Sequence, residues 1–183
     1  SAPWSGCSIA RATPPPSVEE ITTVLARIHG YLAASTPVRL VHRTTGAEIT
    51  DPARVDSGAA IERGTFNFLT YEWSTVYGGM LRATETTGDA RFRDYVEQRM
   101  KFIATWAPAF RGQAATTASA NPFRAMLNPA ALTDAGPMTV AMIKAGRAGI
   151  AADLRPLIDT AAAWVHTQQE RLGDGAFTRI RPQ

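Results

Sequence analysis

One aspartate that follows a long loop is the first residue in this chain that could do chemistry. Asp134 stands near the start of a predicted helix, in the stretch 132-LTDAGPMTVAMIKAGRAGI-150. An aspartate in such a place commonly caps the free N–H groups of the first helical turn. Because the small residues Ala135, Gly136 and Pro137 follow it, the carboxylate could instead face a cleft. Position alone favours the capping role.

A second candidate is the aromatic stretch 71-YEWSTVYGGML-81, in which Tyr71, Trp73 and Tyr77 surround Glu72. Aromatic rings stack on the apolar faces of sugars, and a tyrosine hydroxyl adds a polar contact. The pattern therefore fits a sugar-binding wall. It also fits a core helix whose two glycines let another helix approach closely, and composition alone favours that second interpretation.

A third candidate is the pair of arginines near the end of the chain. Arg179 and Arg181 flank Ile180, so in an extended segment both side chains would point the same way. Two guanidinium groups on one side could clamp a carboxylate. The alternative is a solvated basic tail.

Metal, cofactor and nucleic-acid chemistry find little support in the sequence. No Gly-rich phosphate loop follows a predicted strand, and the histidines lack the spacing and the acidic neighbours of a zinc helix. No metal and no cofactor are therefore expected. The 19 basic and 16 acidic residues give a net charge of +3, and the basic ones are scattered rather than clustered, which argues against nucleic acid. No apolar run reaches the roughly 18 residues of a transmembrane segment.

Helices are the elements that must position these residues. Apolar residues recur at helical spacing over 17–35, 66–85, 90–106, 132–149 and 153–175. Ser17 and Glu20 form a capping box at the start of the first helix. Short turns join the second helix to the third and the fourth to the fifth, which predicts two helical hairpins.

The remaining segments read as connections within a single domain. Residues 37–64 and 108–131 lack helical periodicity and are predicted as long loops, although 38–50 could hold a short hairpin. Residues 1–16 form a Pro/Ser/Ala-rich flexible leader, and 17–183 form one helical-hairpin domain. No strand is predicted with certainty, so the fold class is all-α. Periodicity leaves a bundle, a solenoid and a closed toroid all open.

Three stretches together resemble a known enzyme family. They are 72-EWSTVYGGMLRATETTGDARFRDYV-96, 132-LTDAGPMTVAMIKAGRAG-149 and 173-GDGAFTRIRPQ-183, which in order and spacing resemble the unsaturated rhamnogalacturonyl hydrolases, glycoside hydrolase family 105. The unsaturated glucuronyl hydrolases of family 88 are the nearest alternative. The resemblance implies an (α/α)6 toroid of helical hairpins. A closed toroid needs about a dozen helices, so the five predicted here would form about half of the barrel.

The resemblance also implies a reaction on pectin-type oligosaccharides. A catalytic aspartate protonates the C4=C5 double bond of a 4,5-unsaturated uronic acid left by lyases, and water adds at C5. By the match of motifs, that principal acid is expected beyond Gln183, and Asp134 corresponds to a supporting carboxylate. Trp73 and Tyr77 correspond to the aromatic wall that binds substrate, and Arg179 and Arg181 to a basic segment that enters the pocket.

An unsaturated uronyl hydrolase is therefore the expected function of the parent protein, with an unsaturated uronate oligosaccharide as its substrate. Thr133 stands where the family usually has another acid, so the alternative is a non-catalytic helical module that binds carbohydrate or a partner chain. An open half-barrel would expose apolar helix faces, and self-association could bury them. The leader and the extracellular origin of such substrates suggest a periplasmic or secreted protein, with the cytoplasm as the alternative.

Overall fold

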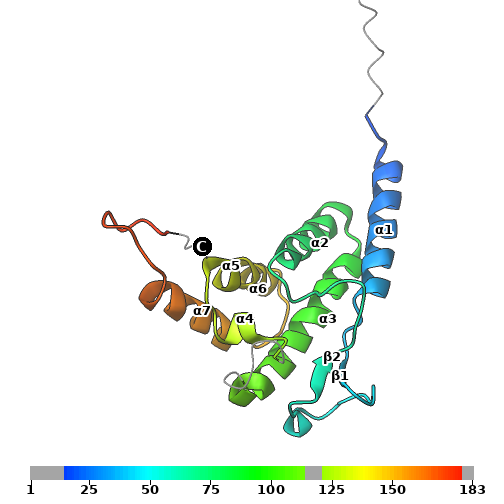
Figure 1. Cartoon of the computed structure of the whole chain (residues 1–183). Helices are drawn as coiled ribbons and strands as arrows, with labels where there is room; N and C mark the ends of the chain where they lie inside the picture. The colour runs from blue at the N-terminus through cyan, green and yellow to red at the C-terminus, as the bar shows by residue number, and fades with distance from the viewer. Residues whose placement is uncertain (1–14, 114–120, 179–183) are drawn as a thin grey trace, which may run out of the picture.

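The computed structural model describes residues 15–113 and 121–178 (Figure 1). This part of the chain is mostly helical and has one two-stranded sheet, so the predicted all-α class is confirmed at that level. The helices are α1 (Val18–Ser35), α2 (Trp73–Thr87), α3 (Ala90–Trp106), α4 (Arg124–Leu127), α5 (Leu132–Ala135), α6 (Pro137–Arg147) and α7 (Arg155–Thr167), the strands are β1 (Leu40–His42) and β2 (Ala59–Ile61), and Pro52–Arg54 and Ala107–Gln113 are 3₁₀-helical.

The predicted capping box starts helix α1. The Glu20 amide donates to the Ser17 hydroxyl (3.2 Å), and the Ser17 amide donates to the Glu20 carboxylate (2.7 Å). Only part of the apolar face of α1 is covered, because Leu25 and Leu32 alone join the main core. A stripe of large apolar residues on the same helix stays exposed: Val18, Ile21, Val24, Ile28 and Tyr31.

Helices α2 and α3 form the first predicted hairpin. Gly88 ends α2 with φ of 73°, a left-handed conformation that glycine adopts without steric cost. Asp89 then caps α3, where its side chain accepts the Arg91 amide. The predicted start of α2 at residue 66 was wrong. The Asn67 side chain accepts the Leu69 amide at 3.0 Å, and such a local bond favours a turn over a helix.

The connection between α1 and α2 holds a small sheet. Strands β1 and β2 pair antiparallel in the register Leu40↔Ile61, and Val41 also bridges to Glu48. The suggested hairpin over 38–50 is present, because the Ile49 amide donates to the Leu40 carbonyl and the His42 amide to the Ala47 carbonyl, each at 2.8 Å. The partner strand β2 lies further along the chain. Each strand is three residues long, which is too short for an alternating pattern to stand out.

The second predicted hairpin is present with two changes. Its first helix is divided at Gly136 into α5 and α6, because Pro137 has no N–H and suits the first position of a new helix. Helix α7 ends at Thr167 rather than near residue 175. The connection 108–131, predicted as a loop, holds the short helix α4 and continues α3 as a 3₁₀ segment.

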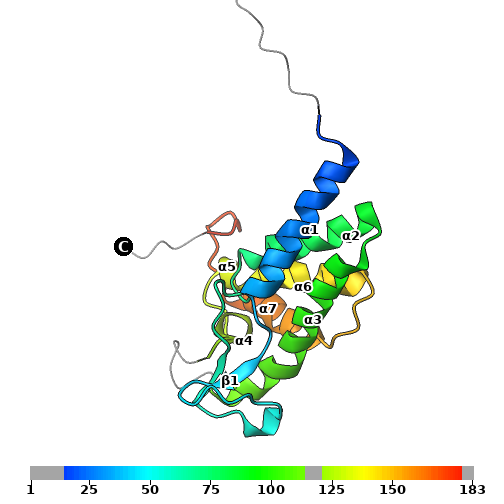
Figure 2. The same cartoon turned by 90° about the vertical axis from the view of Figure 1, so that its right-hand side faces the viewer.

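The helices form a row in which α1 stands at one end and α7 at the other (Figure 1), and Figure 2 views this row from the α1 end. Helices α2, α3 and α6 contact one another in the middle, and α7 packs on α6. Arg93 connects α3 to the turn after α6, because its Nη2 donates to the Gly149 carbonyl at 2.9 Å. None of the described helices is long and apolar enough to cross a membrane.

Candidate functional site around Asp134

Asp134 lies in a pocket of about 320 Å³ that three separate parts of the chain build together. The turn before α2 supplies one wall, α4 another, and α5 carries Asp134 itself. The lining residues are Asn67, Leu69, Thr70, Tyr71, Glu72, Asn121, Pro122, Arg124, Ala125, Met126, Thr133, Asp134 and Met138. The structure thus brings the predicted aspartate next to the start of the predicted aromatic stretch.

The Asp134 carboxylate is anchored through one oxygen. Its Oδ2 accepts the Ala130 amide at 3.0 Å and lies 3.8 Å from Nη2 of Arg124. The side chain keeps 23% of its surface exposed. The sequence favoured a capping role for Asp134, and the structure shows it only in part. Asp134 accepts a hydrogen bond from the Ala130 amide, which lies before helix α5 and before its N-cap, Ala131. Among the described residues, nothing donates to Oδ1, which leaves that oxygen available for a ligand.

Arg124 is the functional candidate that sequence reasoning missed. It comes from the connection 108–131, which offers no periodic pattern that would mark α4. The sequence feature that could have indicated α4 is the Asn121-Pro122 pair before it, which is typical of a turn. In the structure the Asn121 side chain accepts a hydrogen bond from the Phe123 amide at 2.9 Å, one residue before α4 begins. Arg124 is about one-third exposed, so its guanidinium can meet a ligand as well as Asp134.

Glu72 and Tyr71 add a second carboxylate and an aromatic ring to the same pocket. The pKa of Glu72 lies below its ordinary value, because its own backbone N–H and the Thr70 hydroxyl bond to the carboxylate. Glu72 is therefore an anion at neutral pH and suits hydrogen-bond acceptance better than proton donation. Tyr71 is 51% exposed. An exposed ring beside polar groups is the arrangement that sugars favour.

Trp73 and Tyr77, the two predicted aromatic binding residues, lie in the core. Trp73 is 7% exposed and its Nε1 donates to the Tyr95 hydroxyl at 3.2 Å. Tyr77 is 0% exposed and its hydroxyl donates to the Phe68 carbonyl at 2.8 Å. Their polar atoms are thus bound by protein groups, and their geometry matches the core interpretation of the aromatic stretch. Arg179 and Arg181 lie outside the described residues.

Burial of Tyr77 predicts a loss of stability at alkaline pH. Burial raises its pKa well above the ordinary 10.0, so its stabilising contribution is complete below about pH 10 and is lost as pH rises through the folded-state value. We expect the free energy of unfolding, measured in urea, to fall above pH 10. In Tyr77→Phe this alkaline fall should be smaller, while neutral-pH stability drops by about 1–3 kcal/mol because the Phe68 carbonyl loses its donor. An unchanged alkaline slope in the variant would contradict the assignment.

No protein-family model matches the chain, and a search of curated proteins finds none that matches. Across residues 15–113 and 121–178, no group of three or more His, Cys, Asp or Glu side chains could hold a metal ion. What the pocket offers is two carboxylates, one guanidinium and one exposed aromatic ring, which suit recognition of a polar, hydroxyl-rich ligand.

Proposed function

We propose that the Asp134 pocket binds the unsaturated uronyl end of an oligosaccharide and that the chain belongs to an unsaturated uronyl hydrolase. The convergence of Asp134, Arg124 and Tyr71 in one pocket carries this proposal. Arg124 faces the sugar carboxylate, because a guanidinium matches its two oxygens. Tyr71 packs on the sugar ring. The resemblance of the three sequence stretches adds the reaction class.

The proposed fold is part of an (α/α)6 toroid. Two hairpins, α2 with α3 and α6 with α7, contact each other through α6, which packs on both α2 and α3, and such hairpins are the repeating unit of the barrel. Their arrangement supports the proposal, since consecutive hairpins in a toroid pack along a curved wall.

In the proposed reaction, a carboxylic acid of the complete protein other than Asp134 gives a proton to C4 of the unsaturated sugar, and water adds to C5 and returns its second proton to that carboxylate. The hemiketal that forms opens, and the sugar linkage is lost. Asp134 acts as the supporting carboxylate, whose unengaged Oδ1 orients the substrate or the attacking water. Glu72 accepts hydrogen bonds from sugar hydroxyls, which its lowered pKa favours.

The test is hydrolysis of lyase-generated unsaturated disaccharides by the complete protein. We expect the ultraviolet absorbance of the conjugated double bond to decay, and kcat/KM to fall about 100-fold in Asp134→Asn, in line with the loss of one positioned polar group. Asp94→Asn is the control, because Asp94 is exposed on α3 and does not line the pocket. Constant absorbance with every unsaturated uronyl disaccharide would overturn the proposed activity.

A non-catalytic binding module is the second candidate function. The observation that favours it is the engagement of Asp134 by the Ala130 amide and Arg124, an arrangement suited to holding a ligand without proton transfer. In that case uronate oligosaccharides would bind, as measured by isothermal titration calorimetry, without any loss of absorbance. Absence of both binding and turnover would exclude the sugar-binding form of this candidate.

Self-association through α1 is the proposed partner interaction. Two copies of α1 packed antiparallel would bury the exposed stripe and set Glu20 opposite Arg27 of the second copy. We expect a dimer by sedimentation equilibrium at micromolar concentration, and Ile28→Glu should shift it to monomer. Thr23→Glu adds the same charge at an exposed position of α1 outside the stripe and should leave the dimer intact. A monomeric wild-type protein would rule the proposal out.

A further inference from the structure

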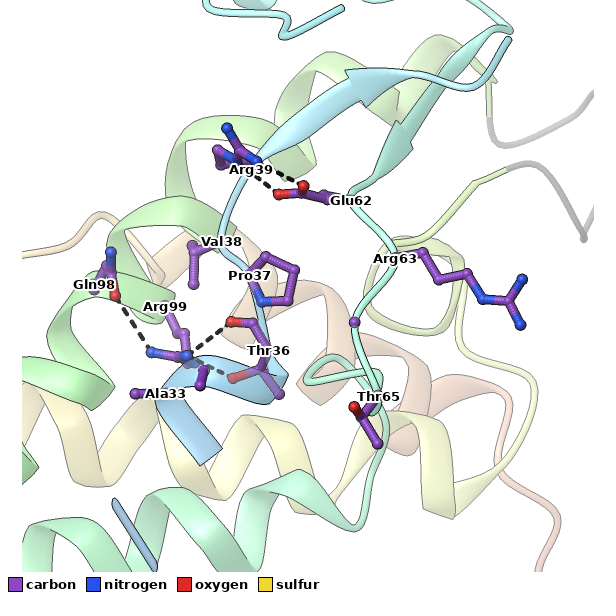
Figure 3. Close-up of a pocket in the computed structure, with 12 residues that line it drawn as sticks. Ala33, Thr36, Pro37, Val38, Arg39, Glu62, Arg63, Thr65, Gln98 and Arg99 are labelled. Atoms are coloured by element: carbon purple, nitrogen blue, oxygen red, sulfur yellow. Dashed lines mark hydrogen bonds and ion pairs between the residues drawn. The ribbon is translucent and has the colours of Figure 1, made fainter. Parts of the chain in front are cut away.

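A larger pocket lies where the end of α1, the segment 36–39 before β1, the segment 62–65 after β2 and helix α3 meet (Figure 3). Its volume is about 800 Å³, within the range of sites for small organic ligands. It shares no lining residue with the Asp134 pocket. Polar side chains dominate its wall, so a polar ligand fits it better than an apolar one.

Arg99 of α3 lies in the wall of this pocket and is 1% exposed. Its Nη2 donates to the Thr36 hydroxyl (2.6 Å) and carbonyl (2.9 Å), and its Nη1 donates to the Tyr95 carbonyl at 3.1 Å and to Oε1 of Gln98 at 3.4 Å (Figure 3). The guanidinium carbon lies 3.4 Å from the centre of the Tyr95 ring. All of these partners are neutral.

The charge of Arg99 therefore has no anionic partner among the described residues. Its Nε is buried and has no hydrogen-bond acceptor there either. Burial lowers the pKa of Arg99, but a guanidinium stays protonated at physiological pH. A buried cation without a counter-ion is costly, and its field extends into the adjoining pocket.

The other charged residues of the pocket leave this positive field in place. Arg39 and Glu62 form a two-pronged ion pair, in which Nε and Nη2 each lie 2.6 Å from a carboxylate oxygen. The opposite charges of Arg39 and Glu62 therefore cancel. Arg63, at the mouth, points away from Arg99 (Figure 3) and pairs with no described residue. The lining thus contains three arginines and one glutamate, so its net charge is positive.

We propose that this pocket binds a small organic carboxylate with hydroxyl groups, such as a uronic or other sugar acid. The carboxylate lies toward Arg99, which supplies the compensating positive charge. The Gln98 amide and the Thr65 hydroxyl, both in the lining, bond the ligand hydroxyls. Inorganic phosphate alone would leave most of the volume empty. The site does not depend on the hydrolase activity proposed for the Asp134 pocket.

The experiment is a titration of the full chain with D-glucuronate, followed by the ¹⁵N nuclear magnetic resonance signal of the Arg99 Nε–H. Because this N–H is buried, its exchange with water should be slow enough for detection. We expect the signal to shift with a dissociation constant of about 1 mM or tighter. D-glucose, which lacks the carboxylate, should leave it unmoved. No shift at about 10 mM glucuronate, or an equal shift with glucose, would overturn the proposal.

Variants outside the core keep the test independent of folding. Gln98→Leu should raise the dissociation constant about threefold to fivefold, because it removes a polar contact to the ligand, and Arg63→Gln should raise it by a similar factor, because it lowers the positive charge of the pocket. Arg147→Gln removes the same charge from an exposed site between α2 and α6 and should have no effect. Phosphate binding more tightly than glucuronate would overturn the assignment to an organic carboxylate, and so would an equal loss in Arg147→Gln.

Discussion

The Arg99→Ala variant is expected to lose about 3–5 kcal/mol of unfolding free energy. The substitution empties the space of a long side chain that is 1% exposed. It removes both hydrogen bonds that Nη2 donates to Thr36, at the end of α1, and the contact with the Tyr95 ring. Loss of a buried cation without a counter-ion offsets part of this cost, but the cavity and the unpaired Thr36 carbonyl outweigh it. Urea unfolding followed by circular dichroism measures the difference.

Two further variants separate the reasons for that loss. Arg99→Met keeps most of the volume and removes the charge, so it should cost clearly less than Arg99→Ala. Arg82→Ala removes an arginine whose side chain is 79% exposed on α2, and we expect a change within about 0.5 kcal/mol. A loss below about 1 kcal/mol in Arg99→Ala would show that the guanidinium contributes little to the attachment of α1.

Helix positions were predictable where one local signal was strong. The capping box of Ser17 and Glu20 and the cap at Asp89 are set by residues close in sequence, and both appear in the structure. The start of α2 was not predictable from periodicity, because the side chain of Asn67 holds a turn that the apolar pattern does not reveal. The division at Gly136 depends similarly on one proline.

The candidate site was only partly predictable because it is assembled from distant segments. Asp134 was singled out from its local context, but its nearest cation, Arg124, lies in a connection without a pattern. The aromatic stretch contributes Tyr71 to the pocket, whereas Trp73 and Tyr77 point into the core. Helical spacing fixes which residues share a face, but which face meets solvent depends on how α2 packs against α3 and α6.

Gly64→Ala is the second substitution with a large expected effect, about 2–4 kcal/mol of lost stability. An added Cβ would collide with the Ser35 carbonyl oxygen and lie 2.5 Å from Cδ of Pro37. Neither atom belongs to a flexible side chain. The Thr65 amide also donates to the Ser35 carbonyl at 2.9 Å, so the segment after β2 cannot move away without breaking that bond. The strain therefore falls on the junction between α1 and β1.

Gly30→Ala is the matched control, and it is expected to increase the stability of the protein rather than lower it. Gly30 lies within α1 and a Cβ there would meet nothing within 4 Å, so alanine should stabilise the helix by about 0.5–1 kcal/mol. Thermal or urea unfolding of both variants distinguishes a steric cause from a general effect of replacing glycine. Because Gly64 also lines the pocket beside Arg99, glucuronate binding should weaken in Gly64→Ala and stay unchanged in Gly30→Ala. Equal stability of the two variants would mean that the contact between residue 64 and the end of α1 is not a close one.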